Sequence, residues 1–184
     1  MLRKLRSRRS LILVSLGLLV FSATSLTLSP KRARADEESS IKGTFTVAFS
    51  VMPNTTGVSY CEGQSQGVVV EAHGAGHSSL GDLSLSIQKT IVGTAMHGCV
   101  ILTALNGDSL TAIYDLTAGP SNANLFRDAT GTLTFTGGTG RFEGASGNAN
   151  VTAVFSRIGG TAAPMQGIAF YSVDGTLSVQ HGDQ

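Results

Sequence analysis

The chain has 184 residues, of which 13 are Lys or Arg and 12 are Asp or Glu, so its formal net charge is +1. Eight of the basic residues lie within residues 1–35, and the remainder carries five basic against all twelve acidic residues, a net charge of −7. A domain of that charge repels phosphate backbones, so we expect no nucleic-acid partner. Its length suits one domain, and its Gly, Thr, Ser and Val content without Trp favours an all-β fold.

Residues 1–35 have the layout of an export signal peptide. A basic head precedes the apolar segment LILVSLGLLVFSATSLTL, and Ala33-Arg34-Ala35 is a small-x-small cleavage site. We therefore expect a single mature domain at residues 36–184 that is secreted, extracytoplasmic and free of the membrane. An uncleaved anchor is the alternative, because the apolar segment approaches the roughly 18 to 20 residues of a bilayer span. Arg8 and Arg9 resemble a bacterial twin-arginine signal, and the general export route stays open.

Segments in which apolar and polar residues alternate follow one another along the mature chain, and this period of two is typical of half-buried strands. The segment at 43–51 places four apolar residues on one face: Phe45, Val47, Phe49 and Val51. The segment at 83–91 does the same with Leu83, Leu85, Ile87 and Ile91. Further strands are predicted at 67–74, 99–105, 109–117, 131–137, 148–157 and 167–179.

About eight short strands without intervening helices leave two folds, a β-sandwich and a closed antiparallel β-barrel. We favour the eight-stranded barrel, because closure removes the exposed sheet edges. Cys61 and Cys99 are the only cysteines, and in an oxidising compartment an even count predicts one disulfide between them. Two buried free thiols are the alternative.

Residues 137–147 read GGTGRFEGASG, which raises the question of a phosphate-binding loop. Such a loop requires a helix after it, whereas here an alternating strand pattern follows, so we expect no nucleotide or other cofactor. The segment resembles the Gly-Gly-Thr-Gly-x-Phe-x-x-Ala-x-Gly hairpin of the allene oxide cyclase and dirigent barrels. Matching positions are Gly137, Gly138, Thr139, Gly140, Phe142, Ala145 and Gly147.

In that family the glycines allow a sharp turn between two barrel strands, and the aromatic residue plugs the barrel end. The resemblance therefore assigns a structural turn to Gly137, Gly138, Gly140, Phe142, Gly144 and Gly147. Three segments, at 74–86, 102–114 and 130–147, also look like a widespread class of secreted bacterial proteins thought to share this barrel. The catalytic residues of the plant enzymes do not map onto this chain, so no catalytic residue is assigned. The related barrels often form trimers, which makes a homo-oligomer an open option.

Two short motifs match the patterns of a catalytic site and a metal site, but the neighbouring sequence does not favour either function. Gly63-Gln64-Ser65-Gln66-Gly67 spells a hydrolase elbow, but a strand pattern follows it where a helix is required. His73 and His77 have the spacing of zinc ligands on a helix, yet the glycines between them disfavour a helix, and no third ligand is near. We therefore expect no metal site.

Three functions stay open for such a barrel. The function that we favour is the binding of a small apolar or phenolic ligand. The alternatives are a structural or cell-surface barrel without a ligand, and a cyclase-like enzyme that acts through the shape of its cavity. Polar residues that interrupt otherwise apolar strands are the candidate ligand-binding residues: Glu71, His73, Tyr114, Asp115 and Tyr171. The alternative for each is that its side chain lies on the exposed face of its strand.

Overall fold

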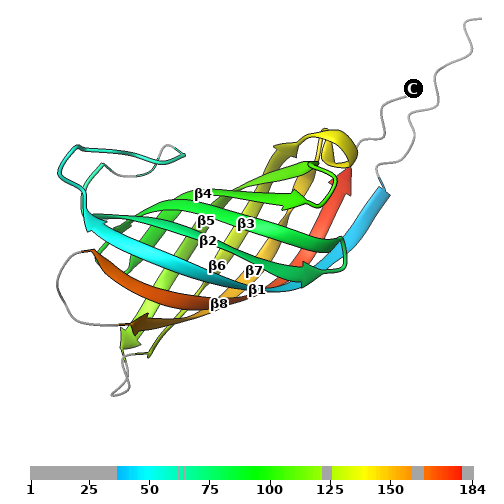
Figure 1. The fold of residues 1–184 in the computed structure, drawn as a ribbon. Coiled ribbons are helices and arrows are strands. Elements are labelled where there is room, and N and C mark those ends of the chain that lie inside the picture. The colour runs from blue at the N-terminus through cyan, green and yellow to red at the C-terminus, as the bar shows by residue number, and fades with distance from the viewer. Residues whose placement is uncertain (1–36, 62, 64, 122–125, 159–163, 180–184) are drawn as a thin grey trace, which may run out of the picture. The chain divides into compact units, whose positions relative to one another are not determined.

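The computed structural model describes residues 37–61, 63, 65–121, 126–158 and 164–179. The described chain forms strands and one turn of 3-10 helix: β1 (Glu37–Pro53), β2 (Val68–Ser78), β3 (Gly81–Val92), β4 (Ala95–Ala104), β5 (Ser109–Ser121), β6 (Phe126–Gly138), η1 (Gly140–Phe142), β7 (Ser146–Ile158) and β8 (Met165–Val179) (Figure 1). The predicted export signal, its cleavage site and the twin-arginine pair lie outside the described residues.

Each strand pairs antiparallel with the next, and β8 pairs with β1, so that the described strands form a closed eight-stranded barrel. This confirms the predicted antiparallel β-barrel, and the sandwich alternative is wrong. No helix in the described part of the chain is long and apolar enough to span a bilayer.

Residues that alternate between apolar and polar in the sequence point alternately to the inside and the outside of the barrel. Phe45, Val47 and Val51 of β1 are buried, whereas Thr44, Thr46 and Ala48 between them are exposed. In β3 the buried residues from Leu83 to Lys89 are likewise the odd-numbered ones. The interior therefore receives every second residue of every strand.

The two halves of this interior differ in packing. The half at the η1 end is filled by large apolar side chains that are at most 5% exposed: Ile41, Leu83, Leu110, Phe135, Phe142 and Leu177. Only about 20 Å³ of space is left among the side chains of the middle layers. The half at the other end, where β1 ends and β2 begins, encloses a much larger cavity of about 510 Å³.

The glycine-rich segment forms the turn between β6 and β7 at the filled end. Gly140 has φ +57°, and a Cβ there would lie 1.9 Å from the Asp108 carboxylate, so both the backbone and the space require glycine. The Phe142 side chain is buried in the barrel core, while Arg141 and Glu143 on either side are exposed. Strand β7 follows the turn, so no long helix presents its N-terminus here.

A disulfide between Cys61 and Cys99 attaches the segment between β1 and β2 to the outer face of β4. The predicted disulfide is thereby confirmed. The Nε2 atom of His97, also on β4, lies 2.7 Å from the Cys61 carbonyl oxygen. The pKa of Tyr60 in the same segment is raised, first by burial and then by the charge of Glu71 on the outer face of β2. The segment is thus held on the outside of the wall whose inner side bounds the cavity.

Replacing Phe142 with Ala is expected to lower the free energy of unfolding by about 3 to 5 kcal/mol, because the ring is buried and its removal leaves a cavity. Urea unfolding of the purified protein measures this change. Glu143→Ala, one position away and exposed, is the matched control and should stay within about 0.5 kcal/mol of wild type. Equal effects of the two substitutions would show that the ring does not plug the barrel.

Removing the disulfide by the Cys61→Ala, Cys99→Ala double substitution should cost about 4 kcal/mol in the chain-entropy model, since the bridge spans 38 residues. Thermal and urea unfolding of the double variant and of wild type provide the comparison. Peptide mapping without reduction should recover one linked pair from wild type. Alkylation of both thiols in the native protein would contradict the bridge.

Candidate functional site

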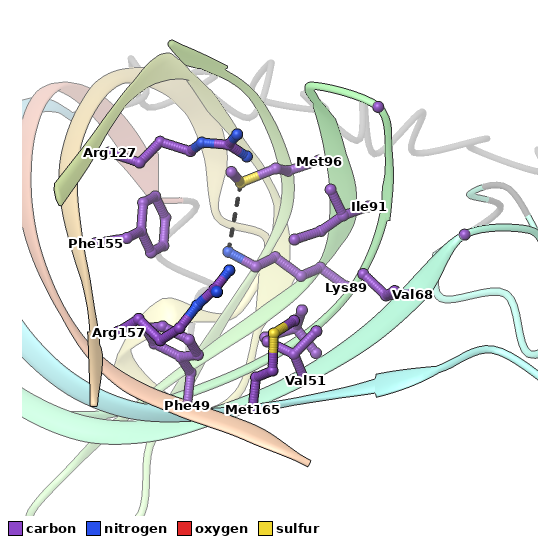
Figure 2. Close-up of a pocket in the computed structure, with 13 residues that line it drawn as sticks. Phe49, Val51, Val68, Lys89, Ile91, Met96, Arg127, Phe155, Arg157 and Met165 are labelled. Atoms are coloured by element: carbon purple, nitrogen blue, oxygen red, sulfur yellow. Dashed lines mark hydrogen bonds between the residues drawn. The ribbon is translucent and has the colours of Figure 1, made fainter. Parts of the chain in front are cut away.

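The cavity at the open end of the barrel is the candidate site (Figure 2). Its volume of about 510 Å³ falls within the range of small-molecule sites. Aromatic and aliphatic side chains make most of the wall: Phe49, Val51, Val68, Val70, Ile91, Met96, Phe155 and Met165. The polar groups that line it are three cations, Lys89, Arg127 and Arg157, and no acidic residue is among the described lining residues.

Lys89 lies on the inner face of β3 at the floor of the cavity and is only 1% exposed. Its neighbours across the sheet are Val70 on β2 and Gly98 on β4. A Cβ on Gly98 would come within 2.6 Å of the Lys89 Cβ, so the glycine leaves the space that the lysine side chain needs. Tyr114 is the partner of Gly98 on β5, and the lysine reaches across to it.

The Lys89 ammonium is surrounded by hydroxyl groups and aromatic rings. Its Nζ donates hydrogen bonds to the hydroxyls of Tyr114 at 3.1 Å and Tyr171 at 3.4 Å, and it lies 3.7 Å from the Met96 Sδ. The Nζ also lies 4.7 Å from the ring centroid of Tyr114 and 4.6 Å from that of Phe155, which places it over π faces. Among the described residues no carboxylate forms an ion pair with it.

Burial in this environment changes the protonation of all three groups. Desolvation lowers the pKa of Lys89 to about 7, because the charged ammonium loses water without gaining a counter-ion. Desolvation raises the pKa of Tyr114 and of Tyr171, whose hydroxyls are also hydrogen-bonded to each other at 3.4 Å. Near neutral pH a large fraction of Lys89 is therefore an uncharged amine beside two protonated phenols.

Two arginines lie closer to the mouth of the cavity, on neighbouring strands. Arg127 of β6 pairs in register with Phe155 of β7, and Arg157 lies two residues further along β7. Both side chains point into the space above Lys89 (Figure 2). The Arg127 Nε is buried without a hydrogen-bond partner in the described part of the chain. A buried unpaired donor costs about 1 to 3 kcal/mol, so this group is set up to gain from an acceptor.

The five residues proposed from sequence separate into two groups. Tyr114 and Tyr171 face the interior and form the layer beneath Lys89. Glu71, His73 and Asp115 are exposed on the outer face, because adjacent residues of a strand point to opposite sides of the sheet. Whether any of the five binds a ligand stays a prediction.

Sequence reasoning missed Lys89, Arg127 and Arg157, although a signal was present for Lys89 and for Arg157. Lys89 has the same parity as the apolar residues Leu83, Leu85 and Ile87 of its strand and could have been assigned inward with them. Arg157 likewise shares the parity of Phe155 on β7. A charge on the apolar side of an alternating strand is the pattern that marks an interior polar group.

The two other motifs lie on the outer face of β2 and in the segment before β2. His73 and His77 are both exposed on β2, and His77 Nδ1 lies 2.7 Å from the Asp82 carboxylate. No group of three or more potential metal ligands occurs among the residues that the structure describes. Gly63, Ser65 and Gly67 lie in the segment before β2, with Gln64 outside the described residues.

No protein-family model and no curated protein matches the sequence. The solved structures that are similar to the chain include the following two. The pterocarpan synthase dirigent protein GePTS1 matches with 15% identity and a TM-score of 0.46 over 82% of this chain and 91% of its own. The pterocarpan synthase dirigent protein PsPTS1 matches with 11% identity and a TM-score of 0.43 over 79% and 97%. Both are dirigent proteins by name, and the likeness concerns the fold alone.

The buried amine predicts a pH-dependent stability. Between pH 7 and about 10 the unfolded chain still protonates position 89 while the folded protein does not, so the free energy of unfolding rises with pH, by up to about 1.4 kcal/mol per unit. Below pH 7 both states are protonated and the dependence ends. Tyr114, Tyr171, Arg127 and Arg157 face Lys89, and none of them supplies a negative charge that would remove the effect.

The substitution Lys89→Met isolates the contribution of Lys89 to the pH dependence of stability, because methionine fills similar space without a charge. The stability gain of Lys89→Met over wild type should be largest at pH 6 and shrink toward pH 10, as measured by urea unfolding at each pH. Lys42→Met is the matched control, since Lys42 is exposed, and its difference from wild type should stay constant. A constant difference for Lys89→Met as well would contradict a buried amine.

Proposed function

We propose that this barrel binds a small ligand with an apolar or aromatic body and an anionic group, and that it does so outside the cytoplasm. The observation that carries the proposal is a largely apolar cavity whose polar lining groups, among the described residues, are all cationic. The body of the ligand would contact Phe49, Phe155 and the aliphatic wall. The Cys61–Cys99 disulfide supports the compartment, because such bonds persist where conditions are oxidising.

The anionic group is assigned to Arg127 and Arg157. Guanidinium groups present several donors in a fixed plane, and a carboxylate or sulfonate can accept two of them at once. The buried Arg127 Nε lacks an acceptor among the described residues, and a ligand oxygen would provide one. Hydrogen bonds to charged groups contribute about 1.5 to 3 kcal/mol, enough for a tenfold or larger preference for the anion.

A structural barrel without a ligand is the competing function. The filled half of the interior shows how this chain packs a barrel when no space is required, with about 20 Å³ left over in its middle layers. The other half leaves about 510 Å³ and buries the ionisable side chain of Lys89 and the Nε of Arg127 beside it. Buried charge lowers stability, so a purely structural role gives no reason for this arrangement.

Titration with naphthoate, an aromatic anion, and with methylnaphthalene, a neutral molecule of similar shape, tests the proposal. The chain contains no Trp, so naphthyl fluorescence anisotropy reports binding directly. We expect saturable binding of both probes, with naphthoate at least about tenfold tighter. Arg127→Gln and Arg157→Gln should each remove most of this preference and leave methylnaphthalene binding within about twofold.

Arg141→Gln is the matched control, because Arg141 is an exposed arginine on the turn at the opposite end of the barrel. It should bind both probes as wild type does. The absence of saturable binding of either probe would favour the structural barrel. Equal naphthoate affinity in wild type, Arg127→Gln and Arg157→Gln would overturn the assignment of the anionic group.

A further inference from the structure

We propose that Lys89 is a nucleophile that forms a Schiff base with an aldehyde or ketone ligand held in the cavity, with the Tyr114 and Tyr171 hydroxyls as its proton donors. The inference rests on the proposed function only in requiring that the cavity admits a small apolar molecule. It goes beyond that function because it assigns a covalent step, a reactive atom and the carbonyl class of ligand to the floor of the cavity.

The first support is the position of the amine. The Lys89 Nζ is the polar atom at the floor of the apolar cavity, and it faces the same space as Phe155 and Met96 (Figure 2). A lysine that served structure alone would be expected to reach a carboxylate, and Lys42 does so with Asp174 at 3.1 Å. Lys89 Nζ instead contacts hydroxyls, a thioether and rings among the described residues, none of which supplies the negative charge that would hold it protonated.

The second support is the pair of phenols. Both hydroxyls lie within 3.4 Å of the Nζ and of each other, so a carbonyl carbon bonded to the Nζ would carry its oxygen within reach of them. Burial holds both phenols protonated, which makes them donors rather than bases. Burial also keeps much of the amine uncharged near neutral pH, and an uncharged amine is the form that attacks a carbonyl.

The step is balanced without any further reactant. The Nζ lone pair bonds to the carbonyl carbon and the carbonyl π bond breaks. Its oxygen takes a proton from a tyrosine hydroxyl, and the nitrogen returns one of its protons to that tyrosine, which gives a neutral carbinolamine. The carbinolamine hydroxyl leaves as water with a proton from a tyrosine, a C=N bond forms, and the proton lost by nitrogen returns to the tyrosine. One carbonyl compound and one amine become one imine and one water, and the oxidation state is unchanged.

Access to the Nζ requires one adjustable side chain to move. Lys89 is 1% exposed, and the Met96 Sδ covers its Nζ from 3.7 Å. Methionine is unbranched and has three rotatable bonds, so it can turn aside into a cavity of this size at low cost. The floor therefore opens to a flat carbonyl ligand without movement of the strands.

The test is reductive trapping with naphthaldehyde as the probe and cyanoborohydride, which reduces an imine to a stable amine. Peptide mapping by mass spectrometry then compares the label on Lys89 with that on Lys42, the other lysine of the mature domain, and on the amino terminus. We expect Lys89 to be labelled at least about tenfold faster than Lys42 at pH 7, because an exposed lysine is almost fully protonated there. The labelling rate of Lys89 should reach half its maximum near pH 7.

Two variants separate the nucleophile from its proton donors. Lys89→Met should lose the label at position 89 and keep the slow label on Lys42. Tyr114→Phe should keep the site of labelling and slow it by at least about tenfold, as expected when a general acid is removed. Its affinity for methylnaphthalene should stay unchanged, which a merely structural effect of the hydroxyl would not require.

Each result decides between the two proposals. Preferential labelling of Lys89 with the expected pH midpoint supports the Schiff base. Saturable binding of naphthoate and methylnaphthalene, with Lys89 labelled no faster than Lys42, overturns the Schiff base and leaves the binding function intact. No binding of any naphthyl probe and no label on Lys89 overturns both.

Discussion

The pairing of β8 with β1 is the constraint on which the rest of the structure depends. It turns a row of antiparallel strands into a closed surface, so that no described strand keeps an unpaired edge. Closure also limits the interior to the space that eight strands enclose, which is enough for side chains or for one small ligand. How the inward-facing residues share this space decides what the barrel can do.

This chain divides that space into a filled half and a hollow half. At the η1 end Phe142 and its apolar neighbours fill the interior, and the burial of these side chains stabilises the fold. Tyr114 and Tyr171 form the boundary layer, because they line the small residual space on one side and contact Lys89 on the other. Beyond them lies the cavity, with cationic groups in its wall.

The wall of the cavity is reinforced from outside. Cys61 is bonded to Cys99, and His97 lies between the Cys61 carbonyl oxygen and the Asp115 carboxylate of β5. Cys99 pairs in register with Gln88, the residue next to Lys89 on β3, so the disulfide attaches close behind the buried amine. A covalent link at this position restrains β4, which lies next to the strand that carries the buried Lys89.

The sequence by itself determined the strands, their inward faces, the disulfide and the turn at 137–147, because each follows from local alternation, cysteine number or glycine spacing. It also led to Tyr114 and Tyr171, but it grouped them with Glu71, His73 and Asp115, which face outward. Only the tertiary structure decided that Lys89, on β3, meets tyrosines from β5 and β8, since the register between distant strands sets that contact. Only the tertiary structure decided, too, that one half of the interior is hollow, because an unfilled volume depends on how side chains from all the strands pack together.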